Sequence, residues 1–488
     1  MSVPDTVLPI VLRCDPAVSR RVRYTFDSLF LAAGIPVEFV DCAPATGPWI
    51  LYAVEREAVG ADSRAVWVAH DSSAWQHFAG TAQITRAEWV DELAVVFPPQ
   101  REAGLGPFDV RFDLAANAFY FLSSWSERYA GDPALTSRQL YRASDFFRLG
   151  VPQDIVDRYL RYLVQRVHAQ CDRLGQPIWT PAVWPDACAF ALVLSHDVDY
   201  LPVRPFDNMI QAAKAVLRHL IRQRDPADAW RAARGWLAAL AAGRDPYGCV
   251  PEILAREQAL GVRSSFQVAV GHRHPNDVNY HIDDDRVRDY LRAIVDAGFD
   301  LCLHGSYRST EDPRWYREEV QLLGERLARP LGSRQHFLSF DYDTLFLAQE
   351  AAGIRYDMSM GFPDQPGPRA GFSYPYFPYN LREDRPFQVV QISLFLMDVT
   401  LRSYMGLRPS SALPIIEASL RDLHAKRGCA SAVWHPIVFA GARDPGYGEL
   451  YFEMADRTRR LQGLPTDGRT IDSYWRHRAK AYTSFSFA

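Results

Sequence analysis

The feature that most constrains this chain is a repeat of strongly apolar strand candidates and amphipathic helix candidates, which runs from about residue 186 onwards. Segments with the 3.6-residue spacing of an amphipathic helix separate most of the strand candidates. Strands that alternate with helices form parallel sheets, because each helix carries the chain back across one face of the sheet. The strand candidates begin at Phe190, Arg263, Phe299, Pro330, Ile354, Phe387 and Cys429. Seven such strands predict a closed or nearly closed parallel (β/α) barrel, with its site at the carboxyl ends of the strands.

The chain has 488 residues, enough for two or three domains. Shorter apolar runs alternate with amphipathic stretches up to about residue 173, and a proline-rich passage over 175–186 has the composition of a linker. We therefore expect a mixed α/β domain of unknown role over 1–180 and the barrel over 181–488. An Ala/Arg-rich stretch at about 205–244 predicts a helical insertion in the barrel.

Composition and charge exclude several classes of protein. A net charge of −4 gives no electrostatic footprint for nucleic acid, and no run of basic residues indicates a membrane surface. No segment is apolar for about 20 residues, so we expect no membrane span, and the first residues lack the pattern of a secretory signal. The seven cysteines are scattered without a C-x-x-C pair, which is typical of reduced thiols and predicts a cytoplasmic protein. The sequence leaves the oligomeric state open.

The strongest chemical signal is Ser195-His196-Asp197-Val198-Asp199, which follows five apolar residues at the end of a strand candidate. The two-residue period of a strand places Asp197 and Asp199 on one face and His196 on the other. Two neighbouring carboxylates at a barrel mouth are costly unless a cation or a proton compensates them. The pair indicates a metal site or acid/base chemistry, although solvated turn residues give the same pattern.

Polar residues also end three later strand candidates. His304 follows one of them, and a neutral imidazole beside a carboxylate suits zinc or a similar divalent ion. Arg334 follows another and is suited to orient a carboxylate through two hydrogen bonds. His435 closes the last long strand candidate, where it is a natural general acid or base. We expect these side chains to converge at one end of the barrel.

From about Asp186 to Arg478 the residues resemble the polysaccharide deacetylases with a NodB-homology domain, carbohydrate esterase family four. That family opens with a strand ending in T-F-D-D or a D-x-D variant, and the sequence from Ser195 to Asp199 is similar to the variant. The resemblance implies that Asp197 is the catalytic base and Asp199 a metal ligand.

Two further family motifs have counterparts here. The motif R-x-P-[YF] corresponds to Arg334-Gln335-His336-Phe337, which implies that Arg334 holds the base and that the backbone N–H of Phe337 binds the oxyanion. The motif L-x-x-H fits Ala432-Val433-Trp434-His435 loosely and implies that His435 is the acid. Asp398 is a candidate to polarise His435, although an Asp at a strand end is equally typical of a turn.

The chain departs from the family at its second motif. The pattern H-[ST]-x-x-H reads His304-Gly305-Ser306-Tyr307-Arg308, so only the first histidine matches. Our hypothesis is that His336, which stands where the family has proline, completes a metal triad with Asp199 and His304. Two alternatives remain open: His272 or His274 supplies the third ligand, or the site is weakened and the protein inactive.

The resemblance implies a divalent metal ion, with zinc the first choice, and hydrolysis of N-acetyl groups on a carbohydrate substrate. Around the site, Tyr307 and Trp434 are candidates to stack on sugar rings, and Arg369 in a Pro/Gly-rich loop is a candidate to contact substrate. The alternatives are an amidase acting on a small or carrier-linked sugar precursor, and an inactive glycan-binding pseudoenzyme. In the N-terminal region, His70-Asp71 repeats the His-Asp pair, but no third ligand follows it and we expect it to be structural.

Overall fold

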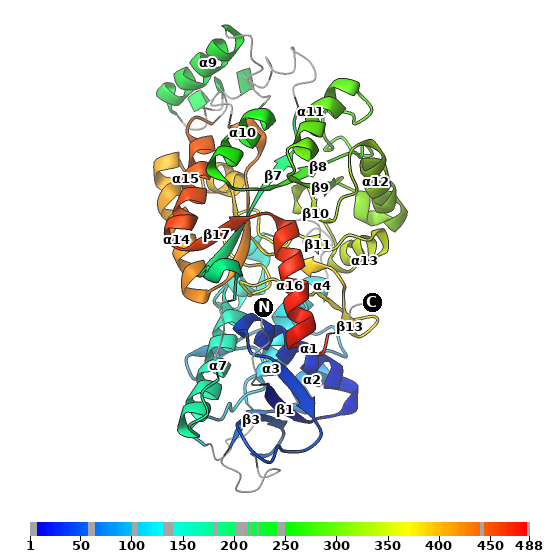
Figure 1. Cartoon of the computed structure of the whole chain (residues 1–488), viewed down its shortest axis with the longest axis vertical. Coiled ribbons are helices and arrows are strands. Elements are labelled where there is room, and N and C mark those ends of the chain that lie inside the picture. The colour runs from blue at the N-terminus through cyan, green and yellow to red at the C-terminus, as the bar shows by residue number, and fades with distance from the viewer. Residues whose placement is uncertain are drawn as a thin grey trace. The chain divides into compact units, whose positions relative to one another are not determined.

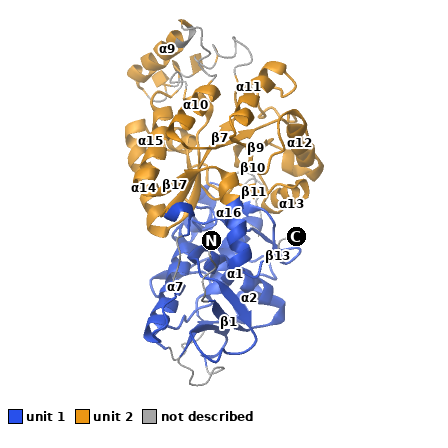
Figure 2. Cartoon of the chain, viewed as in Figure 1, with its two compact units in different colours: residues 1–187, 368–390, 473–488 blue, residues 188–367, 391–472 orange. Residues whose placement is uncertain are grey.

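The computed structural model describes residues 7–56, 64–99, 106–129, 140–178, 183–201, 224–241, 249–439 and 444–485, together with 210, 213–214, 216–217 and 219–221. The chain divides into two compact units (Figure 2). Unit 1 comprises residues 1–187, 368–390 and 473–488, and unit 2 comprises residues 188–367 and 391–472. Unit 1 is therefore assembled from three separate stretches of chain. The sequence analysis placed two of them, residues 368–390 and 473–488, in the barrel domain.

Unit 1 contains a four-stranded parallel sheet in the order β2-β1-β3-β4. Its strands are β1 (Leu8–Arg13), β2 (Val37–Val40), β3 (Trp49–Ala53) and β4 (Ala65–Ala69). Helix α1 (Pro16–Ala33) joins β1 to β2; the Asp15 side chain caps its start, and Gly34 ends it at a φ of 77°. The mixed α/β architecture predicted for the N-terminal region is confirmed.

Shorter elements complete unit 1. An antiparallel hairpin pairs β5 (Glu88–Val90) with β6 (Leu93–Val95), and a second pairs β12 (Tyr379–Asn380) with β13 (Arg385–Pro386). The other α-helices in the described part of unit 1 are α2 (Ser72–His77), α3 (Leu114–Leu122), α4 (Trp125–Tyr129), α6 (Asp145–Arg148) and α7 (Ile155–Arg173). The later segments contact the first helix: Arg478 donates to the carbonyl of Leu31, and Ser484 donates to the carboxylate of Asp27.

Unit 2 is built on a curled sheet with the strand order β14-β11-β10-β9-β8-β7-β16-β15 (Figure 1). Its central strands pair in parallel, as predicted. The strands are β7 (Phe190–Val198), β8 (Ser265–Val268), β9 (Asp300–Gly305), β10 (Gly332–Gln335), β11 (Tyr356–Asp357), β14 (Val390–Gln391), β15 (Leu394–Met397) and β16 (Cys429–Val433). The order follows the chain from β7 to β11, as expected when each helix returns the chain to the adjacent strand.

The two ends of this sheet meet in one segment of chain. Ile392 donates its N–H to the carbonyl of Asp357, and Leu394 donates to the carbonyl of Met360, both at 2.9 Å. On its other side the same segment pairs with β16 through β15. Because it bonds to both neighbours, the curled sheet closes on itself, and the predicted α/β barrel class is confirmed.

An additional strand, β17 (Gly463–Thr466), was missed from the sequence. It pairs with the first half of β7, from Phe190 to Val193, whereas β8 pairs with the second half, from Ser195 to Val198. The amino half of β7 thus pairs with β17, while the carboxyl half, which carries the motif residues, pairs with β8.

Helices cover the outside of this sheet. They are α10 (Val250–Leu260), α11 (Asp285–Asp296), α12 (Pro313–Arg326), α13 (Tyr342–Ala352), α14 (Pro409–Lys426) and α15 (Tyr447–Arg460), with α16 (Gly468–Tyr482) beginning in unit 2 and ending in unit 1. The side chains of Asp284, Asp312 and Asp341 each accept a backbone N–H at a helix start, which explains where α11, α12 and α13 begin.

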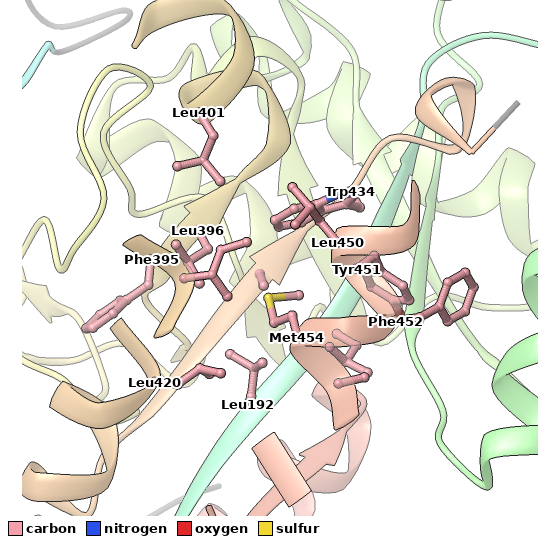
Figure 3. Packing of buried hydrophobic residues seen from close by; sticks show 14 of the residues in the cluster. Leu192, Phe395, Leu396, Leu401, Leu420, Trp434, Leu450, Tyr451, Phe452 and Met454 are labelled. Carbon is pink, nitrogen blue, oxygen red and sulfur yellow. The ribbon is translucent and has the colours of Figure 1, made fainter. Parts of the chain in front are cut away.

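An apolar cluster of unit 2 shows which face of each strand turns outwards. Leu192 of β7 and Leu396 of β15 pack with Leu420 of α14 and with Tyr451 and Met454 of α15 (Figure 3). Alternate residues of the same strands therefore point into the barrel. Because one face of each strand packs in this outer core, only the residues of the other face can reach the inside of the barrel.

The structure describes part of the predicted helical insertion at 205–244. Helix α9 (Pro226–Ala241) is present as expected. Residues 205–209, 211–212, 215, 218, 222–223 and 242–244 lie outside the described residues.

None of the helices in the described part of the chain has the length and apolar character needed to cross a bilayer.

Candidate active site

The motif residues lie at the carboxyl ends of neighbouring strands of unit 2. Asp197 is the penultimate residue of β7 and Asp199 follows its last residue. His304 of β9 and Arg334 of β10 are direct register partners, and His435 follows β16 by two residues. Because β7, β9, β10 and β16 belong to one curled parallel sheet, these ends converge, as the sequence predicted.

The alternation expected along β7 is present. Asp197 faces the inside of the barrel, whereas His196 points the other way and meets the carbonyl of Trp434 at Nδ1 (2.8 Å) and the carboxylate of Glu257 at Nε2 (2.9 Å). His196 thereby ties β7 to the end of β16 and to α10. It is a structural residue behind the site rather than part of it.

Asp197 is held by a completely buried arginine. Nη1 of Arg334 donates to Oδ1 of Asp197 at 2.6 Å, Nη2 donates to Oγ of Ser195 at 2.9 Å, and Nε donates to the carbonyl of Met358 at 3.0 Å. Three hydrogen bonds from one planar guanidinium leave it no rotational freedom. The Asp197 carboxylate is therefore presented in a fixed orientation, as a base requires.

Asp199, His304 and His336 form a compact group on the adjacent side. One potential ligand atom from each lies within 4.8 Å of the others. Nε2 of His304 is 3.0 Å from Oδ1 of Asp199, and Nδ1 of His336 is 3.8 Å from the same oxygen. Nδ1 of His304 meets the carbonyl of Arg334 at 2.9 Å, so it carries the proton and Nε2 presents its lone pair to the group.

This group has the properties of a divalent cation site. Oδ1 of Asp199 and Nδ1 of His336 are both buried, and neither makes a hydrogen bond within the described part of the chain. Burying polar atoms without partners costs free energy, which a coordinated cation would offset. Burial lowers the pKa of His336 to about 4, so its imidazole is neutral at neutral pH, as coordination requires. One carboxylate with two imidazoles is a donor set that suits zinc or a similar ion.

The other histidines considered from the sequence lie elsewhere. The ring of His272 packs on His281 at a centroid distance of 3.9 Å, and the ring of His274 stacks on Tyr307 at 4.5 Å. Neither belongs to a potential metal-binding group of three or more residues among those described. Arg308, at the position of the missing family histidine, is exposed and pairs with Glu311. The geometry thus groups His336, rather than His272 or His274, with Asp199 and His304.

His435 lies across the site from Arg334. Its Nδ1 is 2.7 Å from Oδ1 of Asp398, and its Nε2 is 3.3 Å from Oδ2 of Asp199. Burial alone would lower the pKa of His435, but the Asp398 and Asp199 carboxylates outweigh it and raise that pKa to about 10. The imidazole is therefore protonated at neutral pH, and Asp398 is its orienting partner.

The sequence analysis did not predict that Arg402 pairs with Asp398. Nε of Arg402 lies 3.5 Å from Oδ2 of Asp398, and Nη1 lies 3.4 Å from Oδ2 of Asp444. Burial would raise the pKa of Asp398, but His435 and Arg402 hold it below its ordinary value. Arg402 lies in the π-helix Thr400–Tyr404, four residues after Asp398. The only available signal was this four-residue spacing, which carries little weight in a chain with 51 arginines.

Two of the predicted substrate contacts lie at the site. Phe337 follows His336 with a left-handed φ of 58°, and its side chain is 41% exposed. The rings of Phe337 and Tyr307 meet edge to face at 5.8 Å. They form an accessible aromatic pair beside the metal-binding group.

Two other expectations were wrong. Trp434 is completely buried, packs in the core beneath the sheet (Figure 3) and donates from Nε1 to the carbonyl of Tyr447, so its ring cannot stack on a sugar. Strand alternation explains this, because Trp434 precedes His435 and points to the opposite face. Arg369 belongs to unit 1, where it is buried and paired with both carboxylate oxygens of Glu127. This ion pair gives Arg369 a structural role.

Unit 2 is therefore a parallel α/β barrel that places an arginine-held carboxylate, an Asp/His/His group and a protonated histidine at one end. No protein-family model matches the chain, and no curated protein matches it. Similar solved structures include a protein described as a polysaccharide deacetylase from Mycobacterium smegmatis, with 17% identity over 63% of this chain and 97% of that one and a TM-score of 0.42.

Two further solved structures are similar to the chain. An allantoinase has 18% identity over 60% of this chain and 92% of its own, with a TM-score of 0.40. A glycoside hydrolase or deacetylase from Parabacteroides distasonis has 11% identity over 59% of this chain and 71% of its own, with a TM-score of 0.33. Such distant similarity says nothing about the reaction, which has to be argued from the side chains of the site.

Proposed function

We propose that this chain is a metal-dependent hydrolase that removes N-acetyl groups from a carbohydrate. The observation that carries the proposal is the placement of Asp199 between two groups: its Oδ1 faces the imidazoles of His304 and His336, and its Oδ2 lies 3.3 Å from Nε2 of His435. A metal-binding group and a proton donor therefore share one carboxylate. Amide hydrolysis needs both of these parts within reach of one bond.

Asp199, His304 and His336 would hold the ion. A divalent ion bound there supplies Lewis acidity toward the acyl oxygen and makes a bound water easier to deprotonate. Oδ1 of Asp199 and Nδ1 of His336, which are buried and make no hydrogen bond among the described residues, support this assignment. Zinc is the ion we propose, because two imidazoles and a carboxylate are common zinc ligands.

Asp197 is the proposed base. It accepts a proton from the attacking water as the oxygen bonds to the acyl carbon, and Arg334 keeps the carboxylate oriented throughout. The backbone N–H of Phe337 is the proposed donor to the oxyanion that forms on the acyl oxygen. The left-handed backbone at Phe337 turns the chain sharply at the end of β10, which supports this role.

His435 is the proposed acid. Its protonated Nε2 donates a proton to the amide nitrogen as the C–N bond breaks, because an amine anion is too poor a leaving group to depart alone. The products are acetate and the free amino sugar, and the proton taken by Asp197 restores the acid through solvent. The aromatic pair of Tyr307 and Phe337 supports a sugar substrate, since exposed rings stack on the apolar faces of sugars.

The test combines metal content with product release. Purified protein, Asp199→Ala and His336→Ala are measured by metal mass spectrometry, with acetate release from N-acetylated oligosaccharides assayed on the same samples. His272→Ala is the control, because it removes an exposed histidine that lies outside the group. We expect about one divalent ion per chain in the wild type and the control, and loss of both metal and activity in the other two.

Each departure from this result has a distinct meaning. Full metal content in His336→Ala would exclude His336 as a ligand. A protein that binds metal but releases acetate faster from monomeric than from polymeric substrates would instead be an amidase for small or carrier-linked sugars. No metal after reconstitution and no acetate would leave a glycan-binding pseudoenzyme.

A further inference from the structure

Exposed apolar side chains concentrate in one segment of unit 2. Single exposed apolar residues are normal on protein surfaces, but concentrated ones mark interaction sites. Trp230 is 65% exposed and Ile221 is 66% exposed. Six described large apolar residues in this segment are more than a third exposed: Ile210, Leu217, Leu220, Ile221, Trp230 and Leu237.

Helix α9 shows how this surface is arranged. Ala229 and Ala232 are buried and face the rest of the unit. Trp230 and Leu237 are seven residues apart, or two helical turns, so they lie on the same outward face. Arg234 lies next to them on that face and is exposed. A tryptophan and a leucine flanked by arginine form an amphipathic pattern turned toward solvent instead of toward a core.

The charge of this segment differs from that of the chain. Residues 210–241 contain six basic residues and two acidic ones, in a chain with a net charge of −4. Asp225 pairs with Arg408 at 2.7 Å, and Asp228 pairs with Arg231. The basic residues are interleaved with the apolar ones, which is why the sequence shows no basic run. Interleaved basic and apolar residues with tryptophan are typical of helices that lie in the headgroup region of a bilayer.

The same surface adjoins the support of His435. His219 and Asp228 line a hollow of about 310 Å³ together with Arg402 and Asp444. The exposed Tyr404 ends the π-helix that carries Arg402, and the exposed Met405 follows it. Three residues further on, Arg408 pairs with Asp225 at the start of α9. The ion pair and the shared hollow thus tie α9 to the segment that positions the proposed acid.

We propose that this surface, formed by the described side chains of residues 210–241 with Tyr404 and Met405, docks on an anionic lipid bilayer. The apolar side chains enter the headgroup region, and the basic side chains pair with lipid phosphates. A symmetric contact with the same surface of a second copy is disfavoured, because it would bring two positively charged segments together. The proposal concerns the surface and does not depend on the reaction proposed for the site.

Vesicle flotation of the full chain tests the proposal. The protein is mixed with phosphatidylcholine vesicles that contain either no anionic lipid or about 30% phosphatidylglycerol, which provides a negative surface potential. We expect binding to the anionic vesicles that weakens as salt is raised, and at least tenfold weaker binding to the neutral ones. Equal binding to both, or to neither, would overturn the proposal.

Matched variants locate the contact. Trp230→Ser combined with Leu237→Ser should weaken anionic-vesicle binding at least tenfold, whereas Trp89→Ser, which removes an equally exposed tryptophan of unit 1, should not. Arg234→Gln should weaken binding about fivefold, and Arg314→Gln, an exposed arginine of α12, should leave it unchanged. Acetate release from water-dissolved oligosaccharides should be the same in all four proteins.

Two controls keep the result decisive. Thermal unfolding of the double variant should match that of Trp89→Ser, because both remove exposed side chains. Sedimentation velocity reports self-association. A dimer in the wild type that the double variant abolishes, without vesicle binding, would assign the surface to a second copy and overturn the proposal.

Discussion

Nδ1 of His304 lies 2.9 Å from the backbone carbonyl oxygen of Arg334, its register partner on the neighbouring strand. The guanidinium of the same arginine holds Asp197 at 2.6 Å. One residue of β10 therefore orients both the proposed base and a member of the proposed metal triad. Any change that moves β10 should disturb both groups together.

Replacing Arg334 by methionine should abolish acetate release and lower the melting temperature. The substitution leaves the Asp197 carboxylate buried without its partner, and breaking a buried ion pair costs about 3–5 kcal/mol. Thermal unfolding and the acetate assay measure the two effects. Arg308→Met, at an exposed arginine paired with Glu311, should behave like the wild type. Wild-type activity in Arg334→Met would contradict the role of Asp197 as a base held by this arginine.

Replacing Arg402 by methionine should slow amide hydrolysis more than ester hydrolysis. The variant removes a cation from Asp398, which orients the proposed acid His435. General acid catalysis contributes about 10²–10⁴-fold to amide cleavage, but an aryl acetate has a leaving group that departs without a proton. The ratio of the two kcat values is measured, with Arg421→Met on α14 as control. Equal slowing of both substrates would mean that Arg402 has only a structural role.

The stability of the protein should fall as pH rises through the range in which Asp27 ionises. Burial raises the pKa of Asp27 to about 7, whereas an unfolded aspartate has a pKa near 4. The fold therefore favours the protonated form. The stability contribution of Asp27 is fully present below about pH 4 and is lost by about pH 7, a change of roughly 4 kcal/mol.

Asp27→Asn isolates this effect. The asparagine cannot ionise, so the stability of the variant relative to wild type should rise between about pH 5 and pH 8. Urea unfolding at both pH values measures the difference, and Asp289→Asn, an exposed position on α11, is the control. A relative stability that does not change with pH would mean that Asp27 stays ionised in the fold.

Replacing Trp434 by alanine should destabilise the protein without changing the affinity for substrate. The side chain is completely buried in the core of unit 2, and truncating a buried aromatic residue costs about 3–5 kcal/mol. Tyr307→Ala should do the reverse, raising KM at nearly unchanged stability, because Tyr307 is partly exposed beside Phe337. Thermal unfolding and KM for an acetylated oligosaccharide separate the two. A raised KM in Trp434→Ala alone would contradict this assignment.

Strand periodicity predicted much of the fold. Continuous apolar runs marked the buried strands, and alternation placed Asp197 and His196 on opposite faces, as observed. The strand β17 escaped detection because Gly463-Leu464-Pro465-Thr466 has neither an apolar run nor alternation. Its position comes from pairing with β7, which lies more than 250 residues earlier in the chain. Such distant pairing leaves no local signal.

The candidate site was predicted less completely. The grouping of His304, His336 and Asp199 could be predicted, because each lies at the carboxyl end of a strand and these ends meet at one end of a parallel barrel. Side chains that come from loops were harder to place. Arg369 was assigned to substrate from its loop, but Glu127, more than 200 residues away in sequence, pairs with it. Arg402 was overlooked for the converse reason, since nothing local shows which of many arginines is buried.

The discontinuity of unit 1 has a consequence for biosynthesis. Helix α1 precedes unit 2 in the chain, but Leu31 and Asp27 on it are bonded by Arg478 and Ser484, and Tyr24 donates to the carbonyl of Phe377. During translation these partners emerge only after most of unit 2 has been made. Most of unit 2 can therefore reach its native packing while α1 still lacks these contacts, which leaves part of the surface of α1 uncovered until the later segments have been made.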